Sequence, residues 1–408
     1  MKPRTQITPP DWMTAPQTMA VMAALNDPGD RQTLFVGGCV RNALLGIPVS
    51  DIDLATPYKP DEVIARLQKA GIHYAPTGID HGTVTAITDG RTFEVTTLRV
   101  DVETDGRHAT VAFTGNWMKD AERRDFTMNT LLADDQGNIY DPLGRGLADL
   151  KAGRVLFVGS PAERIAEDYL RILRFFRFHA LYGRGEPDLD ALEACSEAAS
   201  NLFFLSRERV TQEMSKILAI DDPSDTLALM FENFIASEFR GQNFNPKLFS
   251  CLCQTQLHYN AVNITARLAF LANMDYDRAG MLMMLSGAQH KFMRSLVMMT
   301  RDVMSVDEKI IRNLIYGNDR EVVKQLLILY ITRDGDRPEY KRLMQVAEKW
   351  TLPKFPLAGR DLLALGVTPG PAMGQLLGEV EDWWLAQDFA PDRTACLEKL
   401  RSVVETLP

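Results

Sequence analysis

The sequence has no long apolar run, no cysteines at metal-ligand spacing and no excess of basic residues. Its apolar stretches all fall short of the roughly 18 residues that a membrane span needs, and no charged-then-apolar leader with a small-residue cleavage site is present. We therefore expect neither a membrane protein nor a secreted one. Five cysteines occur, and the closest two, Cys251 and Cys253, are spaced too tightly for a zinc knuckle. Their odd number is typical of a reducing compartment, so we expect a cytoplasmic protein.

The charge balance limits the class of partner. Lysine and arginine number 45 against 54 aspartates and glutamates, which gives a net charge of −9 at pH 7. This balance argues against a protein that coats nucleic acid indiscriminately, and we expect no DNA partner, although local basic groups can still bind RNA. With 408 residues, 46% of them hydrophobic, the chain can bury large cores and should hold more than one domain. No feature of the sequence sets an oligomeric state.

A short apolar run followed by glycines begins the most informative segment. Residues 34–36 (Leu-Phe-Val) are expected to form a buried strand, and Gly37 and Gly38 the turn after it. Glycines let a triphosphate approach the backbone, where free N–H groups and a helix N-terminus can hold its oxygens. Arg41 follows as the next helix begins, and this position favours contact with the phosphates.

Two aspartates come next, at a spacing typical of a carboxylate site. Strand periodicity over residues 50–54 places Asp51 and Asp53 on one face and Ile52 on the other. Two carboxylates that point the same way can hold divalent metal ions, which lie roughly 3.5–4 Å apart in two-metal phosphoryl sites. The alternative is a solvated turn with a helix-capping aspartate. That alternative does not account for the glycine turn that precedes the two aspartates.

Two further segments carry candidate polar residues. Residues 82–87 and 93–99 are rich in β-branched residues and predict two strands joined by a turn at 89–90, which puts Glu94 beside the aspartate pair. A surface cross-strand glutamate is the alternative. Residues 123–129 (Arg-Arg-Asp-Phe-Thr-Met-Asn) pack two arginines against an aspartate just before an apolar segment, a pattern that an ordinary ion pair with a helix cap would also explain.

A long helical pattern covers residues 163–180. Its apolar stripe consists of Ile165, Tyr169, Ile172, Leu173, Phe176 and Ala180. The opposite face is charged and contains Glu167, Asp168, Arg171, Arg174 and Arg177. From the residues alone, a solvated charged face explains this pattern as well as a binding face does. Residues 205–210 then predict another helix start, with Ser206 as cap and a structural role in stabilising the preceding helix.

These segments together resemble a known family. The residues G-G-C-V-R-N-A-L-L-G followed by D-I-D, the E-V-T-T-x-R and R-R-D-F-T-x-N segments, and E-D-x-x-R at 167–171 are similar to the motifs of class II tRNA nucleotidyltransferases (CCA-adding enzymes) and the related bacterial poly(A) polymerases. The chain departs from the family at Asn42, where aspartate is usual. Asparagine keeps the size and an acceptor of that residue but loses its charge.

The resemblance implies a role for each candidate residue. Asp51 and Asp53 would bind two Mg²⁺ ions, and Glu94 would be the third active-site carboxylate. Gly38 and Arg41 would lie at the triphosphate. Sugar and phosphates would meet Arg124, Asp125 and Asn129. The incoming base would be read by Asp168 and Arg171, while Arg174 and Arg177 would serve phosphates or hold the two base readers in place.

The resemblance also implies an activity and an architecture. We expect an enzyme that adds C, C and A to the tRNA 3′ end from CTP and ATP, by two-metal nucleotidyl transfer that releases pyrophosphate. The alternatives are an A-adding or CC-adding specialist, a poly(A) polymerase, or a catalytically silent RNA-binding module. The expected fold is α+β, with a nucleotidyltransferase-type mixed sheet in the head and helices in the neck, body and tail. The expected segments are an N-terminal arm (1–30), catalytic head (31–150), neck with base recognition (151–218), body (219–350) and a tRNA-contacting tail (351–408).

Overall fold

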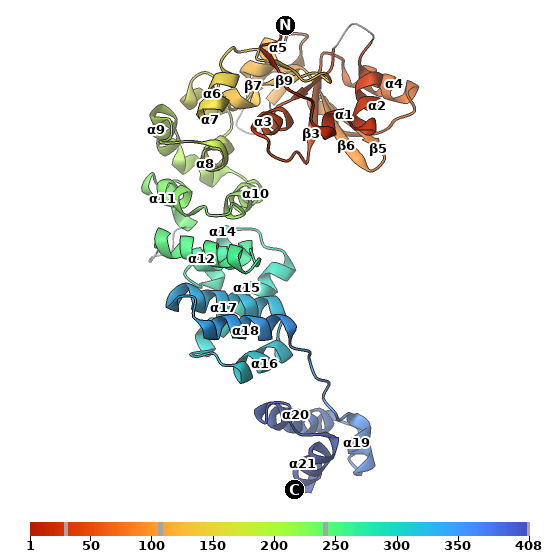
Figure 1. The fold of residues 1–408 in the computed structure, drawn as a ribbon, viewed down its shortest axis with the longest axis vertical. Coiled ribbons are helices and arrows are strands. Elements are labelled where there is room, and N and C mark those ends of the chain that lie inside the picture. The colour runs from red at the N-terminus through yellow and green to blue at the C-terminus, as the bar shows by residue number, and fades with distance from the viewer. Residues whose placement is uncertain (28–31, 105–108, 240–243, 406–408) are drawn as a thin grey trace. The chain divides into compact units, whose positions relative to one another are not determined.

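The computed structural model describes residues 1–27, 32–104, 109–239 and 244–405, and it divides into two compact units, Met1–Glu238 and Phe239–Pro408 (Figure 1). We describe each unit by itself. The expected boundary between arm and head at 30/31, and the last three residues of the expected tail, lie outside the described residues. The first unit combines strands and helices, whereas the described part of the second contains helices only, so the expected α+β class is confirmed.

An eight-stranded mixed sheet forms the centre of the first unit, in the order β1-β10-β9-β2-β3-β6-β5-β4. The β3 and β6 strands pair in parallel, and the other neighbours in this sheet pair antiparallel. A separate antiparallel ribbon joins β7 to β8. The strands are β1 Thr5–Gln6, β2 Leu34–Val36, β3 Ile52–Thr56, β4 His73–Gly78, β5 Thr83–Thr88, β6 Arg91–Thr97, β7 Arg99–Thr104, β8 Ala109–Phe113, β9 Leu132–Ala133 and β10 Asn138–Tyr140.

The strand, turn and helix predicted around the glycines are present. All three residues of β2 are buried, and α3 (Gly38–Leu45) begins directly after Gly37. Gly37 has φ +72° and ψ −122°, a conformation that only glycine adopts without strain, so the turn depends on this residue. Along β3 the residues alternate as expected, with Ile52 and Leu54 buried and Asp53 partly exposed.

The predicted single helix over 163–180 is wrong, because the chain forms two helices, α7 (Pro161–Glu167) and α8 (Leu170–Tyr182). Asp168 between them has extended backbone angles, φ −156° and ψ 104°. Its Oδ1 accepts a hydrogen bond from the Leu170 N–H at 3.1 Å, a local contact that competes with helix continuation. Asp168 therefore does not share a helical face with Arg171.

The remaining helices of the first unit cover the sheet and then continue the chain as a stack of short helices (Figure 1). The α10 helix packs against α8, so the residues that follow the sheet are held together by helix contacts. These helices are α1 Asp11–Thr14, α2 Pro16–Leu25, α4 Pro60–Lys69, α5 Trp117–Glu122, α6 Gly146–Ala152, α9 Leu189–Glu197, α10 Arg207–Leu218 and α11 Ser224–Glu232, with short 3-10 turns η1 Ile79–His81, η2 Thr127–Asn129, η3 Ala199–Phe204 and η4 Ser237–Phe239.

The second unit is built around α17, which packs against α12, α15, α16 and α18. A separate apolar cluster around Trp384 joins the last three helices, and Tyr316 of α16 packs against it. None of the helices formed by the described residues combines the length and the apolar character that crossing a membrane requires. The helices are α12 Pro246–His258, α13 Ile264–Leu271, α14 Tyr276–Leu282, α15 Gly287–Asp302, α16 Glu308–Gly317, α17 Arg320–Asp334, α18 Pro338–Lys349, α19 Gly359–Ala364, α20 Pro371–Ala386 and α21 Arg393–Glu405.

Candidate active site

The three predicted catalytic carboxylates meet on neighbouring strands. Asp53 on β3 lies directly opposite Glu94 on β6 in the parallel register, and Asp51 precedes the first residue of β3. Asp51 and Glu94 are exposed and Asp53 is partly exposed. Two like charges opposite each other on adjacent strands destabilise a sheet. The fold therefore maintains a concentration of negative charge at this position, although it weakens the sheet there.

The electrostatics at Asp53 fit a cation-binding role. Burial and the charges of Glu94 and Asp51 raise the pKa of Asp53 to about 6, and the Arg124 guanidinium offsets only part of this effect. No described residue hydrogen-bonds or ion-pairs with the side chain of Asp53 or Glu94. Carboxylate oxygens are the ligands that Mg²⁺ prefers, and it commonly takes one or two of them together with substrate phosphates. The residues present therefore fit a divalent cation.

The described residues contain no group of three or more His, Cys, Asp or Glu side chains that could hold a metal ion by themselves. The carboxylates thus offer a partial ligand set, which an incoming triphosphate could complete. Such a shared site is typical of phosphoryl-transfer enzymes.

The glycine turn lies beside this carboxylate group. A Cβ atom added at Gly37 would lie 3.6 Å from Nη1 of Arg124 and 3.7 Å from the carbonyl oxygen of Asn129, and the Gly37 N–H donates to the Leu131 carbonyl at 3.1 Å. Gly38 opens α3 without a side-chain cap, so the N–H groups of the first helical turn receive no cap from the chain. The turn thereby brings open backbone donors next to Arg124.

Arg41 is buried, with 6% of its surface exposed, and its guanidinium binds neutral acceptors. Nη1 donates to Oδ1 of Asn129 at 2.5 Å, and Nη2 donates to Oδ1 of Asn42 at 3.0 Å and to the Tyr182 hydroxyl at 2.8 Å. No carboxylate among the described residues lies within ion-pair distance of it. Burial lowers the pKa of Arg41. The asparagine at 42 therefore leaves a buried cation that is hydrogen-bonded but not neutralised.

Asp125 connects Asn129 to Arg174 of α8. Its Oδ1 accepts from Nδ2 of Asn129 and its Oδ2 accepts from Nε of Arg174, both at 2.9 Å. Burial disfavours the charged carboxylate, but Arg174 and Asn129 outweigh it and lower the pKa of Asp125. Arg177 donates from Nε to the buried Glu213 at 2.7 Å. These bonds join Arg41, Asn129, Asp125 and Arg174 into one network, and Glu213, 3.9 Å from Arg174, extends it to Arg177.

One aromatic ring organises three of the guanidinium groups. The ring of Phe178 lies 5.0 Å from Arg41, 5.2 Å from Arg174 and 4.7 Å from Arg177. The negative face of an aromatic ring attracts such cations. Phe178 therefore holds like charges close together that would otherwise repel each other.

The predicted base readers are held by separate ion pairs. Asp168 Oδ2 accepts from Nη2 of Arg209 at 2.7 Å, while Nη1 of Arg171 donates to Oε2 of Glu167 at 2.6 Å. Arg171 also donates from Nη2 to the carbonyl of Arg123 at 3.3 Å, next to the predicted sugar site. Both side chains are thus fixed in position. Asp168 accepts hydrogen bonds from Arg209 and from the Leu170 N–H, and its carboxylate oxygens keep further lone pairs that can accept.

Sequence reasoning missed several members of this network. One is the buried Asp120, which accepts a hydrogen bond at 2.8 Å from Arg124, the residue predicted to meet the sugar and phosphates. Tyr182, at the end of α8, accepts a hydrogen bond from Arg41, and Glu213 of α10 accepts one from Arg177. Arg209 lies in the predicted helix start at 205–210 and contributes its ion pair to Asp168. For Asp120, Arg209 and Glu213 the only sequence signal was their charge, and Tyr182 gave no signal.

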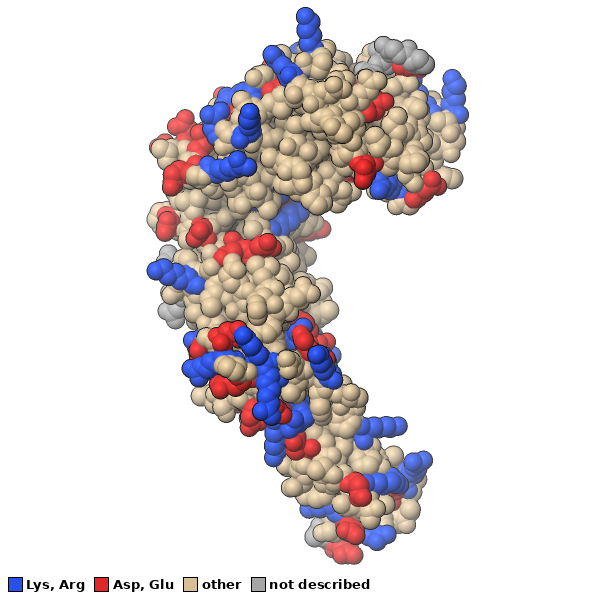
Figure 2. All heavy atoms as spheres, viewed as in Figure 1, with Lys and Arg blue, Asp and Glu red and all other residues tan. Residues whose placement is uncertain are grey.

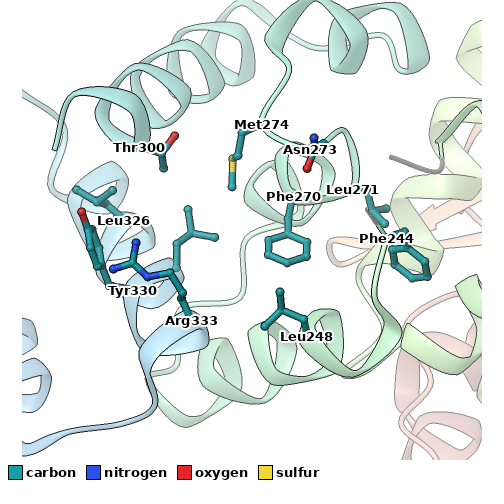
Figure 3. Close-up of a pocket in the computed structure, with 11 residues that line it drawn as sticks. Phe244, Leu248, Phe270, Leu271, Asn273, Met274, Thr300, Leu326, Tyr330 and Arg333 are labelled. Carbon is teal, nitrogen blue, oxygen red and sulfur yellow. The ribbon is translucent and has the colours of Figure 1, made fainter. Parts of the chain in front are cut away.

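The second unit contains a pocket that is unrelated to these residues. A cavity of about 310 Å³ lies among its helices, and Figure 3 shows apolar side chains such as Phe270 and Leu248 turned toward it. Every residue predicted for catalysis or nucleotide binding belongs to the first unit. On the face in Figure 2, acidic and basic side chains are interspersed and neither sign forms a continuous area.

Comparisons with known proteins agree with these motifs. Residues 33–156 match the family described as "Poly A polymerase head domain", and residues 186–239 match "Probable RNA and SrmB- binding site of polymerase A". The chain is 34% identical over 386 residues to the mitochondrial CCA tRNA nucleotidyltransferase 1 of Danio rerio, covering 90% of this chain and 86% of that protein. It is 31% identical to a CCA-adding enzyme of Lacticaseibacillus paracasei, with 93% of each covered.

Solved structures share the fold. The Bacillus stearothermophilus CCA-adding enzyme in complex with CTP superimposes with a TM-score of 0.80 at 23% identity, covering 98% of this chain and 99% of that chain. A Thermotoga maritima CCA-adding enzyme complexed with tRNA gives a TM-score of 0.67 at 19% identity, with complete coverage of both chains. The similarity therefore extends through the sheet and the helices alike.

Proposed function

Because this chain belongs to the family of CCA-adding tRNA nucleotidyltransferases, we propose that it adds C, C and A to the 3′ end of tRNA without a nucleic-acid template. CTP and ATP are the substrates and pyrophosphate is released. The observation that carries this proposal is the placement of Asp53 opposite Glu94, with Asp51 just before β3, beside the glycine turn. Relatives in solved structures bind CTP, ATP and tRNA, which supports the same substrates here.

Divalent metal ions are part of the chemistry of this family, and we propose two Mg²⁺ ions held by Asp51 and Asp53. When bound, such ions lower the pKa of the RNA 3′ hydroxyl and neutralise the leaving pyrophosphate. The raised pKa of Asp53 and the lack of a described partner for its side chain support this role. Glu94 orients the 3′ hydroxyl or shares in holding the ions from the adjacent strand.

The glycine turn and the arginine network position the nucleotide. Gly38 presents backbone N–H groups to the triphosphate, and Arg41 supplies a buried positive charge behind it. Arg124 approaches from the carboxylate side. Asp125 and Asn129 are the groups for the sugar hydroxyls, which can both donate and accept hydrogen bonds.

Asp168 and Arg171 select the base. The carboxylate of Asp168 accepts from an exocyclic amine and Arg171 donates to a ring acceptor, a combination that cytosine and adenine both present. Arg209 and Glu167 hold the two readers at fixed positions. Arg174 and Arg177, each bound to a carboxylate, keep α8 attached to the Asp125 segment and to α10, so we assign them a positioning role.

We retain the proposed division into arm, head, neck, body and tail, with the tail contacting tRNA. The boundary between the two compact units follows Glu238, after α11, whereas the neck was expected to end at 218. We also propose a cytoplasmic location, since all five cysteines are free, as is typical of a reducing compartment. Relatives include both mitochondrial and bacterial proteins.

The decisive test uses three tRNA substrates that end before CCA, after C and after CC. Purified protein is incubated with each in Mg²⁺ and with CTP, ATP or both. Complete addition that stops after one A supports the proposal. Addition of A alone or C alone indicates a specialist, long A tails indicate a poly(A) polymerase, and no incorporation on any substrate indicates a binding module.

A further inference from the structure

Two consecutive phenylalanines lie on the surface of the first unit. Phe203 is 90% exposed and Phe204 is 79% exposed, both at the end of η3. Their ring centroids are 6.2 Å apart with an interplanar angle of 81°. Large aromatic residues are normally buried, so a pair this exposed indicates an interaction surface.

The surroundings of this aromatic pair connect it to the proposed base site. Leu202 is buried and anchors η3, and the Leu205 N–H closes the turn onto the Leu202 carbonyl at 3.1 Å. The chain then enters α10, whose Arg209 binds Asp168. Arg207, in the first turn of the same helix, is exposed. Along the chain the aromatic pair therefore directly precedes the helix that carries Arg207 and the base-reader partner Arg209.

We propose that Phe203 and Phe204 form a stacking platform for the unpaired nucleotides at the 3′ end of the RNA substrate. The proposal rests on the proposed function and adds the residues that hold the acceptor strand. Aromatic rings next to basic side chains are the standard means of binding single-stranded nucleic acid. The match of residues 186–239 to a family described as a probable RNA-binding site supports RNA as the occupant.

The chemistry of the reaction favours stacking over base-specific contacts at this point. Successive additions leave RNA ends with different terminal bases, and the platform has to hold each of them. Every base has a π-face, so stacking tolerates a change of sequence, whereas hydrogen bonds to base edges do not.

The test is steady-state kinetics of the full chain carrying both Phe203→Ala and Phe204→Ala. The KM for a tRNA without CCA should rise at least tenfold, because stacking contributes roughly 1–3 kcal/mol per base. The KM for CTP should stay unchanged. The control is Leu189→Ala, which removes another apolar side chain of the same unit that is 73% exposed, and it should change neither value. Thermal unfolding of the variants should match the parent.

Two further variants separate stacking from simple apolar contact. Tyrosine at both positions should restore tRNA binding, while leucine, which is apolar but not flat, should not. A tRNA carrying 2-aminopurine as its last unpaired nucleotide gives a second readout, since its fluorescence should be quenched on the parent protein and not on the alanine variant. This binding measurement needs no catalysis, so it tests the platform even if no nucleotide is incorporated. An unchanged KM for tRNA, or full rescue by leucine, overturns the proposal and assigns the surface to a protein partner.

Discussion

Replacing Asp53 with asparagine should stabilise the metal-free protein and abolish nucleotide addition. Because the pKa of Asp53 in the folded state, about 6, exceeds its usual value of 3.8, the folded state binds more protons than the unfolded state between these pH values. The free energy of unfolding therefore decreases as pH rises from about 4 to 6 and then levels off. Above pH 6 the folded protein carries the full cost of an ionised Asp53.

The magnitude follows from the two pKa values. A change of tenfold in proton affinity corresponds to 1.36 kcal/mol, so the cost at pH 8 is up to about 3 kcal/mol, and about half of that remains at pH 5. Asparagine has nearly the same shape and no charge. In EDTA at pH 8, Asp53→Asn should thus unfold about 5–10 °C above the parent, and the gap should shrink at pH 5.

The assay is thermal unfolding with and without Mg²⁺, together with CTP incorporation. Mg²⁺ should stabilise the parent and not the variant, since only the parent keeps both aspartates. Incorporation should fall at least about a thousandfold, because the metal supplies several kcal/mol of transition-state stabilisation. Asp89→Asn, at the tip of the β5–β6 turn, removes an exposed carboxylate and should change neither quantity appreciably. If Asp53→Asn unfolds at or below the parent temperature in EDTA at pH 8, our reasoning about this site is wrong.

Three other substitutions test the surrounding network. Asp125→Asn leaves Arg174 with only the more distant Glu213 carboxylate, 3.9 Å away, and should lower the free energy of unfolding by about 3 kcal/mol at pH 7. Because the pKa of Asp125 is lowered in the fold, chemical unfolding should show this difference between variant and parent disappearing only below about pH 4. A difference that disappears near neutral pH would contradict this. Asn42→Asp gives Arg41 a charged acceptor and should raise the free energy of unfolding by about 1 kcal/mol in the same assay. A neutral or destabilising result would contradict this expectation. Gly37→Ala places a side chain at φ +72° and should cost about 1–3 kcal/mol and raise the KM for CTP; an unchanged KM would show that the turn does not touch the nucleotide.

Much of the site was predictable because its signals are local. The strand at 34–36, the glycine turn and the aspartate pair lie within twenty residues, and their periodicity requires no distant contact. Glu94 was placed beside the pair from β-branched residues on both sides of the 89–90 turn, and the parallel register of β3 and β6 agrees.

The helix break at Asp168 was not predictable from periodicity. Apolar residues continue at helical spacing from Ile165 through Leu173, so the pattern gives no sign of an interruption. The break depends on the Asp168 carboxylate, which bonds both to the Leu170 N–H and to Arg209 from α10. Arg209 is 41 residues away in the chain, and only the packing of α10 against α8 brings it there.

The sequence by itself determined the elements of the catalytic head, the carboxylates and the family, because each depends on neighbouring residues and on residue type. Tertiary structure alone decided which acceptor each charged side chain binds. Arg174 could bind any of several nearby carboxylates but meets Asp125, 49 residues earlier, and Arg41 meets Asn129, 88 residues later. Such choices depend on burial and distance in three dimensions, since the strength of an ion pair depends on both. A list of charged residues contains neither quantity.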